Sequence, residues 1–208
     1  MVDIFAKEVF IMVGYPGSGK STLGRKIADI WGIKYLSTDV IRQEIFNSPH
    51  FDPVGGDKLV KSITNRVYEA LYERALDFYQ KNKKVIIDGT HLHTKKREKT
   101  LRILLTKVKA EKICFIMVKT PLKIIDERMS TKTELNNANE TIYDAWKRVH
   151  GYFIRDKKEG LISWPSKNGE IEVVSSDEVC LTLNKFNASD FLSAPLAKPD
   201  IFPHTKTV

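Results

Sequence analysis

A glycine-rich turn near the N-terminus constrains this chain more than any other feature. Residues 14–22 read GYPGSGKST, which satisfies the pattern G-x-x-x-x-G-K-[S/T]. The turn follows an apolar run at 9–13 that predicts a buried strand, and it precedes a helix predicted over about 20–31. In that context the glycines let the backbone wrap closely around phosphate oxygens and point successive N–H groups inward. The sequence therefore predicts a phosphate-binding loop in a strand–turn–helix unit.

The side chains of this loop suit a nucleoside triphosphate with its metal ion. Lys20 can reach the β- and γ-phosphates, and the Ser21 hydroxyl can ligate Mg²⁺. The helix that begins near Lys20 adds the positive end of its dipole. An incidental lysine after a glycine-rich turn is the alternative, which the flanking strand and helix disfavour. We expect ATP and Mg²⁺ as cofactors, with nucleotide contacts from Gly14, Pro16, Gly17, Ser18, Gly19, Lys20, Ser21 and Thr22.

The order of elements predicts the fold class. Short apolar strands at 9–13, 34–37, 85–88 and 113–118 alternate with helical segments, which implies crossover connections and a parallel sheet. We predict a three-layer α/β P-loop NTPase of the kinase type with a parallel central sheet. A polar stretch after Arg128 predicts a helical lid at about 128–142. The kinase domain is expected over 1–186, with further short strands near 171–174 and 179–183, and 187–208 is expected to be a proline-bearing, extended tail.

The net charge is concentrated in one segment. The chain has 34 Lys and Arg against 26 Asp and Glu, a net charge of +8. Between Lys81 and Lys112 there are 11 basic and three acidic residues, so this segment carries the whole excess. Lys95, Lys99 and Arg102 fall on one face of a predicted helix. That face is either a solvated surface or a surface for an anionic partner such as nucleic acid.

Composition excludes several classes of protein. No apolar run approaches the roughly 20 residues that cross a bilayer, and the N-terminus has no basic region followed by an apolar stretch. The two cysteines, Cys114 and Cys180, are too few for a disulfide framework. We therefore expect a cytoplasmic protein with no membrane partner.

The best sign of catalysis follows the second predicted strand. Asp39 at a strand end of such a fold points toward the γ-phosphate, where it could accept the proton of an attacking hydroxyl. Arg42 lies one helical turn further on and could hold the acceptor or a phosphate. The alternative is that Asp39 only caps its helix, and both roles can coexist.

Four other residues carry weaker signals. Asp88 ends an apolar strand and has the form of a second carboxylate near Mg²⁺. His91 and His93 suggest a metal pair, but no third ligand is clearly placed, so a polar role at the mouth of the site is favoured. Arg128 could stabilise charge on the transferred phosphoryl group or could be a surface arginine.

These motifs together resemble a known group of enzymes. The set GYPGSGKST, Asp39-x-x-Arg42, Ile-Ile-Asp88-Gly-Thr-His91 and Glu127-Arg128 is similar to the P-loop kinases related to polynucleotide 5′-hydroxyl kinases. Zeta-type toxins and several small-molecule phosphotransferases share much of that architecture. The likeness covers roughly 9–150. It implies that Asp39 is the general base, that Arg42 contacts the acceptor and that Asp88 lies behind the metal. It further implies that Arg128 belongs to the lid.

Two departures from that group concern the acceptor and the lid. The family often has Asn where this chain has His91, and its lid often carries a second Arg where this chain offers only Lys132. We nevertheless assign His91 and Arg97, together with Arg42, to the acceptor side.

The predicted function is transfer of the γ-phosphoryl group of ATP to a hydroxyl. The basic segment and the family resemblance favour the 5′-OH of a polynucleotide as the acceptor. The alternatives are a small-molecule kinase of the same fold, acting on a nucleotide sugar or metabolite, and an ATP-binding switch or adaptor without kinase activity. A GTPase is disfavoured because no Asn/Thr-Lys-x-Asp segment for reading guanine occurs.

Overall fold

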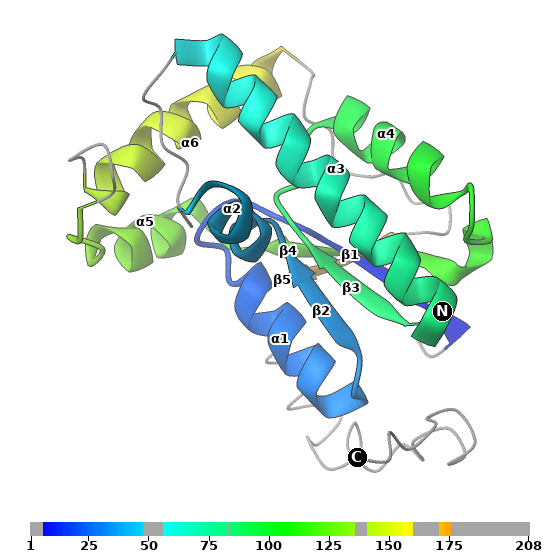
Figure 1. The fold of residues 1–208 in the computed structure, drawn as a ribbon. Helices are drawn as coiled ribbons and strands as arrows, with labels where there is room; N and C mark the ends of the chain where they lie inside the picture. The colour runs from blue at the N-terminus through cyan, green and yellow to red at the C-terminus, as the bar shows by residue number, and fades with distance from the viewer. Residues whose placement is uncertain (1–5, 48–55, 83, 136–140, 160–170, 176–208) are drawn as a thin grey trace, which may run out of the picture.

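The computed structural model describes residues 6–47, 56–82, 84–135, 141–159 and 171–175. Strands and helices are interleaved along the chain, as Figure 1 shows. The strands are β1 (Val9–Val13), β2 (Lys34–Ser37), β3 (Val85–Asp88), β4 (Ile113–Lys119) and β5 (Ile171–Ser175). The helices are α1 (Lys20–Trp31), α2 (Thr38–Phe46), α3 (Gly56–Asn82), α4 (Thr94–Leu104), α5 (Leu122–Ser130) and α6 (Ile142–Lys158), and a 3₁₀ turn (Ala110–Lys112) precedes β4.

The five strands form one sheet in the order β2-β3-β1-β4-β5, and every neighbouring pair is parallel. β1 lies at the centre, where Val9 pairs with Val85 of β3 and with Ile113 of β4. All five residues of β1 are buried, as expected for a central strand of a sheet covered on both faces. The predicted parallel sheet is confirmed.

Helices cover both faces of the sheet and give three layers. Phe10 and Met12 of β1 pack in one apolar cluster with Ala28 and Trp31 of α1. Val9, Ile11 and Val13 point to the opposite face and share a larger cluster with residues of α3 and α4 and with Ile125, Trp146 and Phe153 of α5 and α6. Figure 1 shows α1 on one side of the sheet and α3 and α4 on the other. The predicted three-layer α/β class is therefore confirmed.

The early elements begin and end close to their predicted positions. α1 covers Lys20–Trp31 and β2 covers Lys34–Ser37, as the sequence predicts. The strand predicted near 171–174 is also present, as β5. The predicted strand at 179–183, the tail at 187–208 and residues 136–140 of the expected lid lie outside the described residues. Within the described part of the chain, no helix has the length and apolar character needed to span a membrane.

Candidate active site

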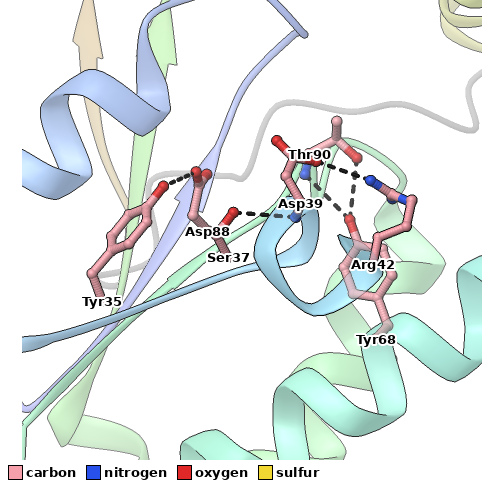
Figure 2. A network of polar contacts seen from close by, with 7 residues as sticks. All are labelled: Tyr35, Ser37, Asp39, Arg42, Tyr68, Asp88 and Thr90. Carbon is pink, nitrogen blue, oxygen red and sulfur yellow. Dashed lines mark hydrogen bonds and ion pairs between the residues drawn. The ribbon is translucent and has the colours of Figure 1, made fainter. Parts of the chain in front are cut away.

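The segments that follow β1, β2 and β3 meet at one edge of the sheet. Ser37 at the end of β2 pairs with Asp88 at the end of β3, and Met12 near the end of β1 pairs with the same Asp88. Because parallel strands end at the same edge, the glycine-rich loop after β1 lies beside the end of β3 and the start of α2. Figure 2 shows the polar side chains gathered there. The predicted phosphate loop and the predicted carboxylates thus share one site.

The glycine-rich loop has a backbone that side chains would disturb. Gly17 and Gly19 have φ angles of 82° and 90°, in the left-handed region that favours glycine. At Gly14 the limit is space, because a Cβ there would lie 2.7 Å from Ser18 Oγ and 3.0 Å from a backbone oxygen of β4. The Thr120 hydroxyl, just after β4, donates to the Ser18 carbonyl over 2.7 Å and holds the loop against the sheet.

The N-terminus of α1 is open toward this loop. Gly19 occupies the N-cap, and none of the described side chains caps the helix there. The first turn contains no acidic residue, so its backbone N–H groups and dipole favour an anion. Lys20 and Ser21 are partly exposed at the same place. This end of α1 can hold phosphate groups.

Asp88 is the buried carboxylate of the site, with a relative exposure of 2%. Its Oδ2 accepts a hydrogen bond from the Tyr35 hydroxyl. Its Oδ1 is buried and has no hydrogen-bond partner among the described residues. A buried carboxylate oxygen without a partner is costly unless a cation or ordered water satisfies it. With Ser21 nearby, the donor set consists of oxygens and fits Mg²⁺, which is bound through few protein ligands, water and phosphate.

Asp39 and Arg42 form an ion pair at the start of α2. Ser37, and not Asp39, is the N-cap: its Oγ accepts a hydrogen bond from the Asp39 backbone N–H over 3.2 Å. The idea that Asp39 only caps the helix is therefore wrong. Asp39 Oδ1 lies 2.9 Å from Arg42 Nη1, and the Asp39 side chain is 62% exposed whereas that of Arg42 is 11% exposed. The arginine is thus an anchored partner, and the carboxylate reaches solvent.

The last turn of α5 and one face of α6 cover the loop. Arg128 is exposed, and its Nη1 lies 3.6 Å from the point where a Cβ on Gly19 would be. A Cβ on Gly17 would lie only 2.9 Å from Met129 Cγ, so Met129 packs directly against this glycine. From α6, the indole N–H of Trp146 donates to the Pro16 carbonyl over 3.2 Å. The predicted lid arginine therefore lies next to the phosphate loop.

His91 does not lie at the mouth of the site, and its predicted contact with the acceptor needs correction. The residue is fully buried and has a φ of 42°. Its Nδ1 must donate to the Met12 carbonyl, 2.9 Å away, and its Nε2 therefore accepts from the Tyr72 hydroxyl at 3.2 Å. Burial, with a smaller contribution from the charge of Lys96, lowers the pKa of His91 to about 3. His91 is a neutral residue that fastens the end of β3 to β1.

Arg97 is also buried, so its predicted contact with the acceptor is wrong for the same reason. Its exposure is 6%, and its guanidinium donates to the carbonyls of His91, at 3.0 Å, and of Leu92. An arginine that satisfies the buried carbonyls of a loop stabilises the turn between β3 and α4. The suggested metal pair is absent as well, because His93 faces Asp156 at 3.4 Å and the described residues contain no group of three or more His, Cys, Asp or Glu that could hold a metal.

The basic face of α4 is exposed but only partly free. Lys95, Lys99 and Arg102 are all exposed, as the helical spacing predicts. Lys99 Nζ lies 3.6 Å from a carboxylate oxygen of Glu69 on α3. Lys96 leaves this face and lies over the Tyr68 ring, 3.5 Å from its centroid. The sequence analysis did not single out Lys96, whose ammonium group contacts this aromatic ring of α3.

Two tyrosines of the site were missed by the sequence analysis. The Tyr68 hydroxyl accepts a hydrogen bond from the Thr90 backbone N–H over 3.2 Å, as Figure 2 shows. Tyr35 lies two residues before Ser37 and hydrogen-bonds with Asp88. The alternation of strand residues places Tyr35 on the same face of β2 as Ser37, which is a signal that could have found it.

Known proteins resemble this chain in sequence and in structure. The family model described as "AAA domain" matches residues 9–153. Among curated proteins, adenylate kinase isoenzyme 5 of Bos taurus is 31% identical over 106 residues, which are 47% of this chain and 18% of that relative. The match thus spans less than a fifth of that relative's length.

Solved structures share the fold at low sequence identity. A sugar kinase of Janibacter sp. HTCC2649 has a TM-score of 0.55 and 14% identity, with 89% of this chain and 98% of that chain covered. Shikimate kinase of Bacteroides thetaiotaomicron has a TM-score of 0.52 and 11% identity, over the same shares of the two chains. The chain therefore has a P-loop kinase-like fold.

Proposed function

The chain belongs to this AAA-domain family, and from that premise we propose that it is an ATP-dependent kinase that phosphorylates a hydroxyl group. One observation carries the proposal: the exposed carboxylate of Asp39 forms an ion pair with the mostly buried Arg42, at the same edge of the sheet as the glycine-rich loop. A protein that only binds nucleotide needs no such base. The kinase names of its relatives and structural neighbours are consistent with this activity.

The nucleotide side of the reaction belongs to the loop and α1. The backbone N–H groups of the loop and the N-terminus of α1 bind the phosphates, and Lys20 neutralises charge on the β- and γ-phosphates. Ser21 and Asp88 would hold Mg²⁺, which supplies positive charge to the phosphate oxygens when it is bound. Arg128, next to Gly19, contributes positive charge from α5 toward the transferred group.

The acceptor side belongs to α2. The acceptor oxygen attacks the γ-phosphorus while the bond to the β,γ-bridging oxygen breaks, and ADP leaves with that oxygen. The hydroxyl proton passes to the Asp39 carboxylate, which acts as general base. Arg42 holds Asp39 in place through the ion pair at 2.9 Å. Trp146 and Met129 cover the loop and limit access of water to the phosphates.

We further propose a polynucleotide 5′-OH as the acceptor, supported by the exposed basic face of α4 and by the motif resemblance. A small hydroxyl compound is the alternative, and the pairing of Lys99 with Glu69 favours it because that pairing removes one free cation from the face. The direct test incubates the protein with γ-labelled ATP and, in turn, 5′-OH DNA, 5′-OH RNA, nucleosides and sugars.

The outcomes of that screen separate the proposals. Label on an oligonucleotide supports the polynucleotide acceptor, and label on a nucleoside or sugar supports a small-molecule kinase. Label that appears only as inorganic phosphate, at a rate that Asp39→Asn leaves unchanged, would contradict a kinase and favour the ATP-binding switch.

A further inference from the structure

Tyr35 on β2 has a hydroxyl that stands between the two residues of the proposed metal site. It donates a hydrogen bond to Oδ2 of Asp88, as Figure 2 shows. The same hydroxyl forms a side-chain hydrogen bond with Ser21, in the first turn of α1. Ser21 and Asp88 come from different elements, and Tyr35 comes from a third. One hydroxyl thus connects three segments of the site.

Chemistry fixes which group donates in each of the two hydrogen bonds that join Ser21, Tyr35 and Asp88. An ionised carboxylate only accepts, so the Tyr35 hydroxyl is the donor to Asp88. The Tyr35 oxygen then accepts from the Ser21 hydroxyl. The order of donation is Ser21 to Tyr35 to Asp88.

This order leaves the right atoms free for a cation. Ser21 uses its proton toward Tyr35, so lone pairs of its oxygen remain available. Asp88 uses Oδ2 toward Tyr35, while its buried Oδ1 has no hydrogen-bond partner among the described residues. A metal ion, or a water molecule bound to it, requires oxygen atoms whose lone pairs are available in this way.

The aromatic ring of Tyr35 is itself held in place. A Cβ on Gly24 of α1 would come within 3.0 Å of Tyr35 Cε2, so the ring packs directly on the backbone of α1. The Arg25 guanidinium carbon lies 5.5 Å from the ring centroid on the same helix. The ring is wedged between α1 and the sheet, which fixes where its hydroxyl lies.

From these contacts we propose that Tyr35 is a positioning residue for Mg²⁺: its hydroxyl orients Ser21 and Asp88 so that their free oxygens face the metal. The inference rests on the proposed function, because the metal matters here as the partner of ATP. Removal of a group that hydrogen-bonds to a metal ligand and orients it typically lowers metal affinity by about 10–100-fold.

The test compares wild type with Tyr35→Phe, which keeps the ring packing and removes only the hydroxyl. Affinity for a non-hydrolysable ATP analogue is measured by calorimetry with Mg²⁺ and with EDTA, and Mg²⁺ is then titrated into the protein–analogue complex. We expect Mg²⁺ affinity to fall by about 10–100-fold and analogue affinity in EDTA to stay within a few-fold of wild type. Equal losses with and without Mg²⁺, or no loss, would overturn the proposal.

Two further variants sharpen this experiment. Tyr79→Phe is the matched control. The Tyr79 hydroxyl also donates to a carboxylate, at 2.7 Å, but its partner is Glu8, just before β1. This variant should leave Mg²⁺ affinity unchanged. In a double-mutant cycle with Ser21→Ala, Tyr35→Phe should cost less than it costs alone, because the two residues act on one site. Additive losses would overturn the proposal. Wild type that binds the analogue equally well with and without Mg²⁺ would overturn the proposed metal site as well as Tyr35's role.

Discussion

The burial of His91 predicts a specific dependence of stability on pH. The imidazole of the unfolded chain takes up a proton below about pH 6.5, whereas the folded protein resists protonation until about pH 3. Because the folded-state pKa is lowered, the unfolded state binds more protons in this interval, and stability is lost as the pH falls. Between pH 6 and pH 5 alone, His91 should remove about 1 kcal/mol of the free energy of unfolding.

The substitution His91→Asn isolates this contribution. Asparagine does not titrate and tolerates the left-handed backbone, for which His91 has a φ of 42°. Urea unfolding at pH 6 and pH 5 should show that wild type loses about 1 kcal/mol more than the variant over this step. His93→Asn is the control. His93 is half-buried and faces Asp156, whose negative charge opposes the lowering of the His93 pKa by burial. This substitution should therefore change the pH dependence of stability less than His91→Asn does. Equal pH dependence of wild type and His91→Asn would show that His91 does not cause this loss of stability.

Three further predictions concern the proposed nucleotide and acceptor contacts. Lys20→Ala should weaken ATP binding by about 10–100-fold in calorimetry and leave the thermal midpoint unchanged, because the side chain is partly exposed. Arg128→Ala should lower kcat by about 10²–10³-fold with little change in KM for ATP, whereas unchanged kcat would make it a surface arginine. Removing Lys95, Lys99 and Arg102 together should flatten the log–log salt dependence of single-stranded oligonucleotide affinity by about two units. An unchanged slope would return this face to a solvated role.

The parts of the fold that depend on local pattern were predictable. The loop with its flanking strand and helix follows from residue types at fixed spacing, and the strands of the parallel sheet are short apolar runs. The strand-end rule also brought Asp39 and Asp88 to one edge of the sheet. These inferences need only periodicity and the rule that the carboxyl ends of parallel strands share an edge.

The errors concern residues whose environment is set by distant segments. His91 and Arg97 are polar residue types that are common in binding sites. His91 is buried because it packs against Tyr72 of α3, and Arg97 is buried because it binds carbonyl groups after β3. The sequence analysis considered Asp39 as a helix cap, yet the chain turns two residues earlier and Ser37 takes that place. Tyr35 was overlooked because a tyrosine in a strand is typical of packing, and only the tertiary structure brings its hydroxyl to Asp88.

The substitution Asp39→Asn tests whether Asp39 is the general base of a hydroxyl kinase. The amide keeps the size of the side chain but cannot take a proton, and the Ser37 cap of α2 does not depend on it. Transfer of γ-labelled phosphate to the acceptor that wild type uses should fall by about 10²–10⁴-fold, with ATP affinity within a few-fold of wild type. Transfer within a few-fold of wild type would show that Asp39 is not the general base.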